Sequence, residues 1–416
     1  MCRKKALNVD VVMKRMNMNA VGRWICDMLA VCKREFALVF RDMGVVLFFL
    51  LLPTVYPILY ALIYNPEYVR EVPVVVVDDC RSDMSREYAR RLDASQYVKI
   101  VGYAANMQEA RKCMAEKECY AIVNFPEDFS RCIGRGEQAH VSIYSDMSLL
   151  LRYKGILMAA TDVQAAMGAD VRAEVMQQAA ASGTAGIGMI PTIDSASVAM
   201  GNTAMGLASA LLPGILVLIL QQSLILGVCM LAAGSRERAR LNGGIDPKEI
   251  RTGDVRQMLG KTLCYLVIYI IPLIYILKYV PMIFSYPQNG HSLDMIAFMV
   301  PFLLSSIFMG MTIQVFIRER EAVFPLFVFT SVLFLFLSGL SWPRFAMSGL
   351  WYLIGSCFPS TWAMNGYIAM KSNGALLHQV SHPYAMLWLL TAVYFLLALA
   401  VRKFIDKKQE HAGMKN

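Results

Sequence analysis

Charged residues are scarce in this sequence of 416 residues, at 17% of the total, and histidine occurs five times. Soluble domains carry about 25% charged residues. Hydrophobic residues are correspondingly abundant, at 57% of the chain, and the mean hydropathy is +0.47. These values exclude an ordinary soluble enzyme and predict a chain that keeps much of its surface in lipid.

Catalytic and nucleotide-binding motifs are also missing. Gly260-Lys261-Thr262 resembles the end of a phosphate-binding loop, but Val255 replaces the glycine needed five positions earlier, and no strand precedes it. His378 and His382 have the spacing of two metal ligands on a helix, but no HExxH sequence accompanies them and Pro383 follows. No GxSxG sequence occurs either. We therefore expect no active site, cofactor or metal in this chain.

Long apolar runs are what the chain does contain. A helix needs about 20 apolar residues to cross a bilayer. The runs predict six membrane-spanning helices, within 45–64 and 207–401, at residues 45–64, 207–233, 262–280, 295–317, 322–340 and 385–401. Residues 342–370 are also apolar, but prolines and glycines interrupt them, which predicts a re-entrant or surface-lying hairpin.

The distribution of charge predicts the orientation of these spans. Six spans place four segments on one side of the membrane, and these segments are 1–44, 234–261, 318–321 and 402–416. They hold 23 basic and 12 acidic residues, whereas the other side holds 17 basic and 19 acidic residues. Because basic loops face the cytoplasm, we expect both termini there. The net charge of +9 then reports orientation rather than a nucleic-acid surface.

Residues 65–206 form a separate region between the first two spans, outside the cytoplasm. Short β-branched runs alternate there with helical patterns, which predicts an inserted α/β domain. The expected strands are 72–78, 97–102, 119–125 and 140–144. The expected helices are 82–92, 107–115, a short one opened by Pro126, and 149–181, with a Gly- and Ser-rich junction at 182–206. The predicted fold class is thus an α-helical polytopic membrane protein with an inserted extracytoplasmic α/β domain.

Four of the ten cysteines lie in this outer domain, at Cys80, Cys113, Cys119 and Cys132. An oxidising compartment would permit disulfides, and three connectivities are possible. Cys113 and Cys119 flank a short turn and could approach each other. Four buried thiols are the alternative, and the sequence leaves the choice open.

Two segments on the basic side could receive a soluble partner. Residues 21–43 have apolar residues at helical spacing, which predicts an amphipathic helix along the inner leaflet. Its candidate interfacial residues are Trp24, Lys33, Arg34, Glu35, Arg41 and Asp42. The loop 234–261 places Arg236-Glu237-Arg238 directly after a span. The simpler alternatives are a lipid anchor for the helix and a solvated charged face for the loop.

Ionisable residues are absent from the interiors of the predicted spans, which argues against a proton- or sodium-coupled carrier. The polar residues Gln221, Gln222 and Gln314 do occur there. Such residues typically mediate helix packing, and contact with a transported substrate along a pathway is the alternative. Transport without an ion site or nucleotide site would need energy from another subunit.

Four groups of motifs follow one another along the chain. They are Lys33-Arg34-Glu35-Phe36 with Arg41-Asp42; Leu212-Pro213-Gly214-Ile215 with Gln221-Gln222 and Arg236-Glu237-Arg238; Gly260-Lys261; and Leu337 to Pro343 with Phe358-Pro359-Ser360-Thr361. In this order they resemble the permease subunits of ABC-2 type exporters that have a large outer domain after the first span. The family-motif positions near the re-entrant segment are Ser338, Gly339, Pro343, Pro359 and Thr361. The sequence departs from the family after Arg238, where Ala239-Arg240-Leu241 lacks the family's acidic residues.

The resemblance implies a function and a set of partners. The chain would be the permease of an ABC exporter, moving substrate out of the cytoplasm or the inner membrane with ATP and Mg bound by a separate ATP-binding subunit. The implied contacts with that ATPase, its coupling loop, are Arg236, Glu237, Arg238, Arg240, Gly260 and Lys261. Further implied partners are a second permease chain in a homo- or heterodimer, a periplasmic adaptor and an outer-membrane channel. The implied location is a bacterial inner membrane. The alternative function is ABC-linked mechanotransmission or signalling, in which the outer domain senses a ligand and no substrate passes.

Overall fold

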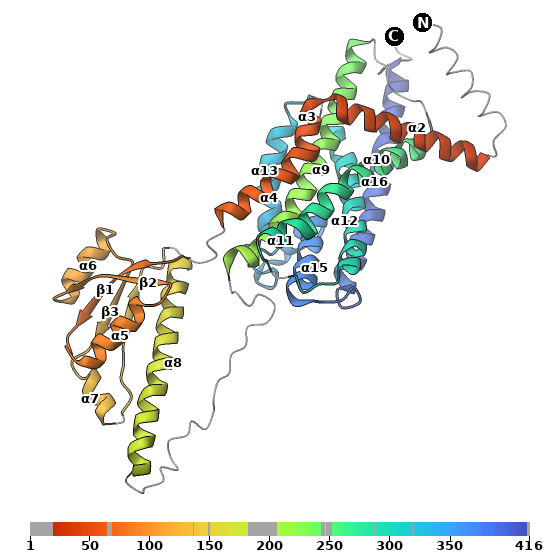
Figure 1. Cartoon of the computed structure of the whole chain (residues 1–416). Helices are drawn as coiled ribbons and strands as arrows, with labels where there is room; N and C mark the ends of the chain where they lie inside the picture. Colours follow the sequence, from red (N-terminus) through yellow and green to blue (C-terminus); the bar gives the residue numbers. More distant parts are fainter. Residues whose placement is uncertain are drawn as a thin grey trace. The chain divides into compact units, whose positions relative to one another are not determined.

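The computed structural model describes residues 20–64, 69–135, 137–148, 150–181, 206–242, 246, 252–286, 288–317 and 319–413. The chain divides into two compact units (Figure 1). One comprises residues 1–65 and 199–416 and is helical, and the other comprises residues 66–198 and contains a β-sheet. The predicted junction at 182–206 lies outside the described residues except for Gly206.

The helical unit contains five described helices that are long and apolar enough to cross a membrane, which confirms five of the six predicted spans. They are Met43–Ile63, Leu207–Leu241, Asp254–Ile283, Ser292–Phe316 and Ser381–Phe404. The first consists of α3 (Met43–Val46), η1 (Leu47–Leu51) and α4 (Leu52–Ile63), and the second is α9 (Leu207–Leu241). The third consists of α10 (Asp254–Ile274), η2 (Tyr275–Tyr279) and α11 (Val280–Ile283). The fourth is α12 (Ser292–Ile313) with η3 (Gln314–Phe316), and the fifth belongs to α16 (Ser381–Gly413).

The sixth predicted span, at 322–340, is shorter than expected. It corresponds to α13 (Val323–Leu337), an apolar helix of 15 residues. At 1.5 Å per residue such a helix is about 22 Å long, less than the roughly 30 Å of a hydrocarbon core. The helix ends because Gly339 takes a left-handed conformation, with φ of +94°.

The apolar segment after α13 forms a pair of short helices. After η4 (Arg344–Ala346), α14 (Gly349–Ser356) and α15 (Pro359–Asn373) are joined by Cys357 and Phe358. Pro359 occupies the first turn of α15, where its missing N–H leaves no hydrogen bond unmade. Gly374, with φ of +69°, ends α15. This helix packs against α9, α12 and α16.

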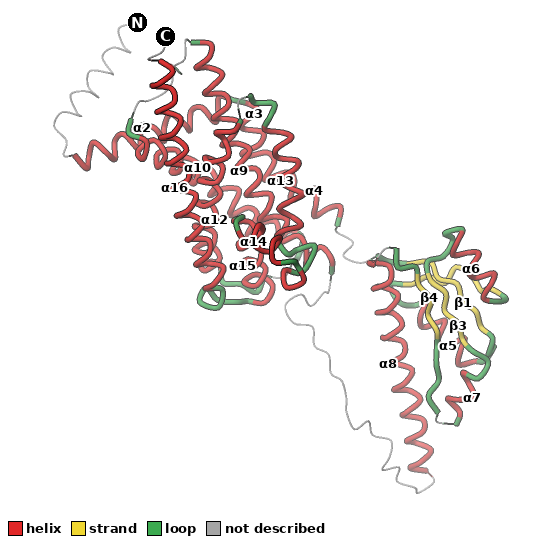
Figure 2. The backbone as a smooth tube through the Cα atoms, turned by 180° about the vertical axis from the view of Figure 1, so that it is seen from behind, coloured by secondary structure: helices red, strands yellow, loops and turns green. Residues whose placement is uncertain are grey.

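The core of the helical unit is built around α9. In its most apolar 18-residue window 89% of the residues are buried, against 22% in the first and last spans. Helices α12, α13, α15 and α4 all pack on it, and Figure 2 shows it among the other long helices. A helix that is apolar on all sides is expected at such a central position.

The other unit is a four-stranded α/β domain, as predicted. The strands are β1 (Val72–Asp78), β2 (Val98–Ala104), β3 (Ala121–Phe125) and β4 (Ser142–Ser145), in the order β2-β1-β3-β4. Strand β1 is parallel to β2 and β3, and β4 is antiparallel to β3. The helices are α5 (Asp83–Asp93), α6 (Met107–Ala115), α7 (Phe129–Gly134) and α8 (Leu150–Ala181). One core lies between the sheet and α5, α7 and α8, and a smaller one lies under α6 (Figure 2).

Candidate functional site at the α2 end of the helical unit

Charged side chains gather at one end of the helical unit, which we call the α2 end. It is formed by α2 (Ala20–Arg41), the last turns of α9, the start of α10 and the turn that precedes α13 (Figure 1). Ion pairs there join α2 to α10, α9 to the turn before α13, and α16 to α10. This end contains most of the sequence motifs singled out above.

Gly260 and Lys261 hold α10 against α2. A Cβ atom on Gly260 would lie 2.7 Å from the Met28 carbonyl oxygen, so only glycine permits this close approach. Lys261 Nζ then lies 3.2 Å from Glu35 Oε1, and the Glu35 side chain is 3% exposed. In this structure the Gly-Lys pair therefore forms a helix-crossing contact with an ion pair beside it.

Further contacts fix α2 along α10. Arg256 Nη1 donates to Asp27 Oδ2 at 2.8 Å. The thiols of Cys32 and Cys264 are hydrogen-bonded to each other, and burial raises the pKa of the Cys32 thiol. These contacts lie on the inner face of α2, so the helix is attached to the bundle along much of its length.

The outer face of α2 is apolar. Five large hydrophobic side chains on it are between 43% and 71% exposed, and they are Val21, Ile25, Leu29, Phe36 and Phe40. Of the predicted interfacial residues, Lys33 and Arg41 are exposed, Trp24 and Arg34 are partly buried, and Glu35 is buried. The structure thus separates an exposed apolar stripe from a charged face turned towards α10.

Asp246 is a buried carboxylate that sequence reasoning missed. Its side chain is 1% exposed and accepts hydrogen bonds from Ser235 Oγ at 2.7 Å and from Arg238 Nη2 at 3.0 Å. Arg34 Nη2 of α2 lies 3.5 Å from the same Oδ2 atom. One carboxylate therefore connects α2 with the end of α9. The sequence offered one weak signal, an acidic residue in a mainly basic loop.

Arg236 and Glu237 connect the end of α9 to other elements. Arg236 Nη1 donates to the carbonyl oxygens of Gln314, at 2.6 Å, and Ile317, where α12 and η3 end. Glu237 Oε2 lies 3.2 Å from Arg320 Nε, and its side chain is 61% exposed. Arg236 thus has a structural role, whereas Glu237 keeps an exposed carboxylate.

Arg320 joins two elements at once. Its Nη1 atom lies 2.8 Å from Asp42 Oδ2 at the start of α3, opposite the pair with Glu237. Gly234 makes room for this guanidinium, since a Cβ atom there would lie 2.3 Å from Arg320 Nη2. Of the predicted ATPase contacts, Glu237 and Arg240 are the two exposed side chains. Arg236, Arg238, Gly260 and Lys261 are turned inward to varying degrees.

Gln221 and Gln222 bond to neighbouring helices. Gln221 Nε2 donates to Ser360 Oγ of α15 at 3.3 Å, and Gln222 Nε2 donates to Thr330 Oγ1 of α13 at 3.4 Å. Their side chains are buried in the bundle. The third predicted pathway residue, Gln314, accepts from Arg236 through its backbone carbonyl. These contacts favour a packing role for the side chains of Gln221 and Gln222.

The motif after α13 forms a turn that α15 holds in place. Ser338 Oγ donates to the Leu335 carbonyl oxygen, and the Ser338 carbonyl oxygen accepts from Asn365 Nδ2 of α15 at 3.1 Å. Gly339 supplies the left-handed residue described above. Pro343 precedes η4, and Pro359 and Thr361 lie in the first turn of α15. These positions therefore shape the chain between α13 and α15.

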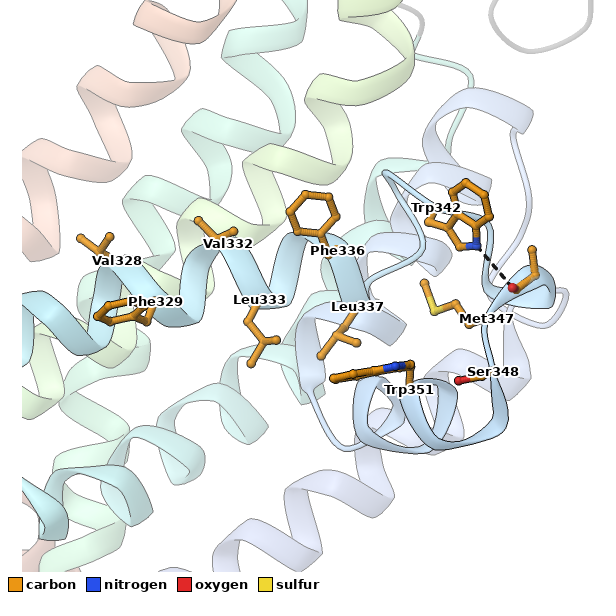
Figure 3. Close-up of a pocket in the computed structure, with 11 residues that line it drawn as sticks. Val328, Phe329, Val332, Leu333, Phe336, Leu337, Trp342, Met347, Ser348 and Trp351 are labelled. Carbon is orange, nitrogen blue, oxygen red and sulfur yellow. Dashed lines mark hydrogen bonds between the residues drawn. The ribbon is translucent and has the colours of Figure 1, made fainter.

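An apolar groove lies between α13 and the segment that follows it (Figure 3). Its volume is about 760 Å³. The side chains that line it are mostly large and apolar, and they are Val328, Phe329, Val332, Leu333, Phe336, Leu337, Trp342, Ala346, Met347, Ser348 and Trp351. Trp342 Nε1 donates to the Ala346 carbonyl oxygen at 3.3 Å, which holds the segment in a loop beside the groove.

The histidines and cysteines that the sequence suggested as metal ligands or disulfide partners take no part in the contacts described above. Within the described ranges, no group of three or more His, Cys, Asp or Glu side chains could hold a metal ion. The His382 ring packs against Trp362. The outer-domain cysteines are free thiols, and burial raises the pKa of Cys119, which lies in the small core under α6.

Comparison with known protein families identifies the family of this chain. A family model described as ABC-2 family transporter protein matches residues 43–400. The matched region begins at the first span and continues into α16, and it includes the α/β domain. No curated protein matches the chain.

Proposed function

The chain belongs to the ABC-2 family of transporter membrane proteins, and from this we propose that it is the permease subunit of an exporter. A partner subunit binds ATP with Mg, and its hydrolysis moves a substrate out of the cytoplasm or the inner membrane. The observation that carries the proposal is the family match over residues 43–400, joined to a charged α2 end that links several helices.

In this proposal the α2 end faces the cytoplasm of a bacterium, at the inner membrane. The excess of basic residues in the segments that meet there supports this orientation. The exposed apolar stripe of α2 suits the surface of the inner leaflet. Six crossings require α13 to cross together with the residues that follow it, and both termini are then cytoplasmic.

The ATP-binding subunit contacts α2 and the last turns of α9. Glu237 and Arg240 are exposed there and can pair with charges on a partner. A displacement of the last turns of α9 is transmitted to α2 and α10, because Asp246 connects α9 to α2 and Lys261 connects α2 to α10. Nucleotide binding in the partner then favours one of two arrangements of the spans.

A second permease chain completes the translocation path in this proposal. The groove of Figure 3 supports a contact of this kind, since its concave apolar wall can receive side chains from another helix. The α/β domain meets a periplasmic adaptor, which leads to an outer-membrane channel. Its edge strand β2 exposes Val101 and Tyr103, which are 51% and 62% exposed.

The test reconstitutes the chain with its ATP-binding subunit in vesicles and measures ATP hydrolysis. We expect Glu237→Arg to insert normally but to lose the stimulation that the wild-type permease gives. Glu321→Arg is the matched control, because it reverses an exposed acidic charge at the same end. Arg320→Met breaks the ion pairs of Arg320 with Glu237 and Asp42 and leaves Glu237 in place. Normal stimulation by Glu237→Arg, or equal loss in Arg320→Met, would contradict the assigned contact.

Mechanotransmission without transport is the second candidate function. The α/β domain supports it, because a folded domain of this kind can bind a partner or ligand. Stimulation of the ATPase by molecules that dissolve in the membrane favours export. Stimulation that needs a partner of the α/β domain, in the absence of any transported molecule, favours mechanotransmission.

A further inference from the structure

A lysine is buried near the end of α15, away from the α2 end. Lys371 is 1% exposed. It lies on the same face of α15 as Tyr367 and Ser360, since residues four, seven and eleven apart share one side of a helix. Tyr367 and Ser360 are both 0% exposed. This face therefore carries three polar side chains although it is turned into the interior.

Two polar atoms on this face lack partners. Among the described residues, neither Lys371 Nζ nor Tyr367 OH makes a hydrogen bond. The ammonium lies 5.6 Å from the centre of the Tyr367 ring, a contact that leaves its three donors unused. A buried charge without a hydrogen-bonded partner is strongly disfavoured. Burial accordingly lowers the pKa of Lys371 to about 7.

The acidic residue beside this region is already engaged. Asp294, at the start of α12, accepts a hydrogen bond from the Leu377 backbone N–H at 3.3 Å. Its other oxygen lies 4.0 Å from His291 Nδ1. No ion pair joins Lys371 to a carboxylate in the part of the chain that the structure describes. The described part of the site therefore contains the Lys371 ammonium and the Tyr367 hydroxyl, and no carboxylate that pairs with them.

Lys371 follows buried apolar residues on α15, and a short loop contacts the backbone at the end of this helix. Met364 and Met370, on the same helix, are 1% and 0% exposed. Asn289 reaches across the end of α15, where its N–H donates to the Lys371 carbonyl oxygen at 3.0 Å. Gly290 lies so close that a Cβ atom would be 2.5 Å from the Met370 carbonyl oxygen.

We propose that Lys371 and Tyr367 bind the acidic group of an anionic amphiphile, a phosphate or a carboxylate attached to an apolar chain. The ammonium pairs with the acid, the hydroxyl of Tyr367 donates to it, and the methionine-rich surroundings accept the apolar chain. This proposal rests on the proposed export function, because it assigns the chemical class of the transported molecule. A phospholipid of the membrane carries the same chemistry, so the source of the anion must be distinguished.

The binding test uses the purified full-length chain in nanodiscs of phosphatidylcholine and needs no ATPase. Decyl phosphate is the probe, and decyltrimethylammonium is its cationic counterpart. We expect decyl phosphate to raise the unfolding temperature, with an apparent affinity about tenfold lower in Lys371→Met, since a charge-assisted hydrogen bond is lost. Tyr367→Phe should weaken binding less. Lys278→Met, at an exposed lysine of η2, should bind like the wild type.

Two further arms separate the sources of the anion. If the natural ligand is a resident lipid, phosphatidylglycerol in the nanodisc stabilises the wild type over Lys371→Met without any probe, and decyl phosphate leaves ATP hydrolysis unchanged. If it is transported, decyl phosphate stimulates ATP hydrolysis by the reconstituted complex, and Lys371→Met loses this response. Equal shifts with the cationic probe, or equal binding by the wild type, Lys371→Met and Tyr367→Phe, overturn the proposal. Because binding is measured without the ATPase, its failure is distinct from a failure of the export function.

Discussion

The Glu35 carboxylate of α2 lies 3.2 Å from the Lys261 ammonium of α10, immediately beside the glycine on which the two helices cross. The Arg34 guanidinium lies 3.7 Å from the same oxygen of Glu35. Glu35 is therefore a nearly buried anion between two cations. The amphipathic helix α2 is thus attached to the rest of the helical unit through charge as well as through apolar contacts.

We expect Glu35→Ala to lower the free energy of unfolding of the helical unit. Removing the carboxylate leaves Lys261 partly buried without its anion, while Arg34 keeps Asp246. The change should cost about 1–3 kcal/mol after allowance for the solvent that reaches Lys261. Unfolding of the purified protein in detergent measures this loss. Lys33→Ala, at an exposed position on the same helix, should change stability by less than about 0.5 kcal/mol. Equal losses of stability in the two variants would show that the Glu35–Lys261 ion pair does not stabilise the helical unit.

Substitution of Gly260 should loosen α2 from α10. The Cβ atom of Gly260→Ala would meet a backbone carbonyl oxygen at 2.7 Å, and neither backbone can move without shifting its helix. We expect a loss of about 1–3 kcal/mol and faster proteolysis within α2. Gly349→Ala is the matched control, because no atom lies within 4 Å of its Cβ position. If α2 of Gly260→Ala resisted proteolysis as well as α2 of the wild type, the close contact of α2 with α10 at Gly260 would be contradicted.

We expect Asp246→Asn to lower both the free energy of unfolding and the stimulation of ATP hydrolysis, because both depend on this carboxylate. The change leaves Arg34 and Arg238 facing a neutral amide, and we expect a loss of about 3 kcal/mol. We also expect weaker stimulation of ATP hydrolysis, since α9 and α2 are no longer tied by charge. Asp79→Asn, at an exposed carboxylate of the α/β domain, controls for the loss of one negative charge. Full stimulation by a destabilised Asp246→Asn protein would show that the link is structural only.

The stability of the helical unit should rise with pH because of Lys371. Its pKa is lowered to about 7 in the folded chain, while an unfolded lysine has a pKa of about 10.4. Between these values the unfolded chain binds more protons, so the free energy of unfolding increases with pH. We expect the wild type to gain more stability than Lys371→Met between about pH 7 and pH 9. Decyl phosphate should reduce the difference, since it binds the protonated amine. Parallel pH profiles would contradict the burial of a titrating amine.

The α/β domain could be predicted closely from the sequence. Strand β1 and helix α6 have the predicted bounds. Four consecutive valines mark a buried strand, and Asn106 accepts from the Glu109 backbone N–H to begin α6. Here local signals and tertiary structure agree, and periodicity alone is sufficient.

The charged end could not be predicted in the same way. A charge beside a span suggests a solvated residue, and nothing local shows that Arg236 turns inward to the end of α12. The contact of Gly260 with Met28 joins residues far apart in the sequence. The length of α13 was missed because a hydropathy window counts apolar residues and does not register the left-handed Gly339. Lys371, followed by polar residues and a glycine, resembles an ordinary exposed helix end.

Helix α9 runs without interruption for 35 residues and carries Pro213 near its start. A proline inside a helix removes one hydrogen bond of the ladder and weakens that turn. Pro213 therefore divides α9 into a short N-terminal segment and a long C-terminal segment. The residues before Pro213 pack with Ala61 and Tyr286, while the long segment carries Arg236 and Glu237 in its last two turns and ends at Leu241. Pro213 is therefore the position at which α9 would bend at the least cost, and the short segment before it is held by its packing with Ala61 and Tyr286.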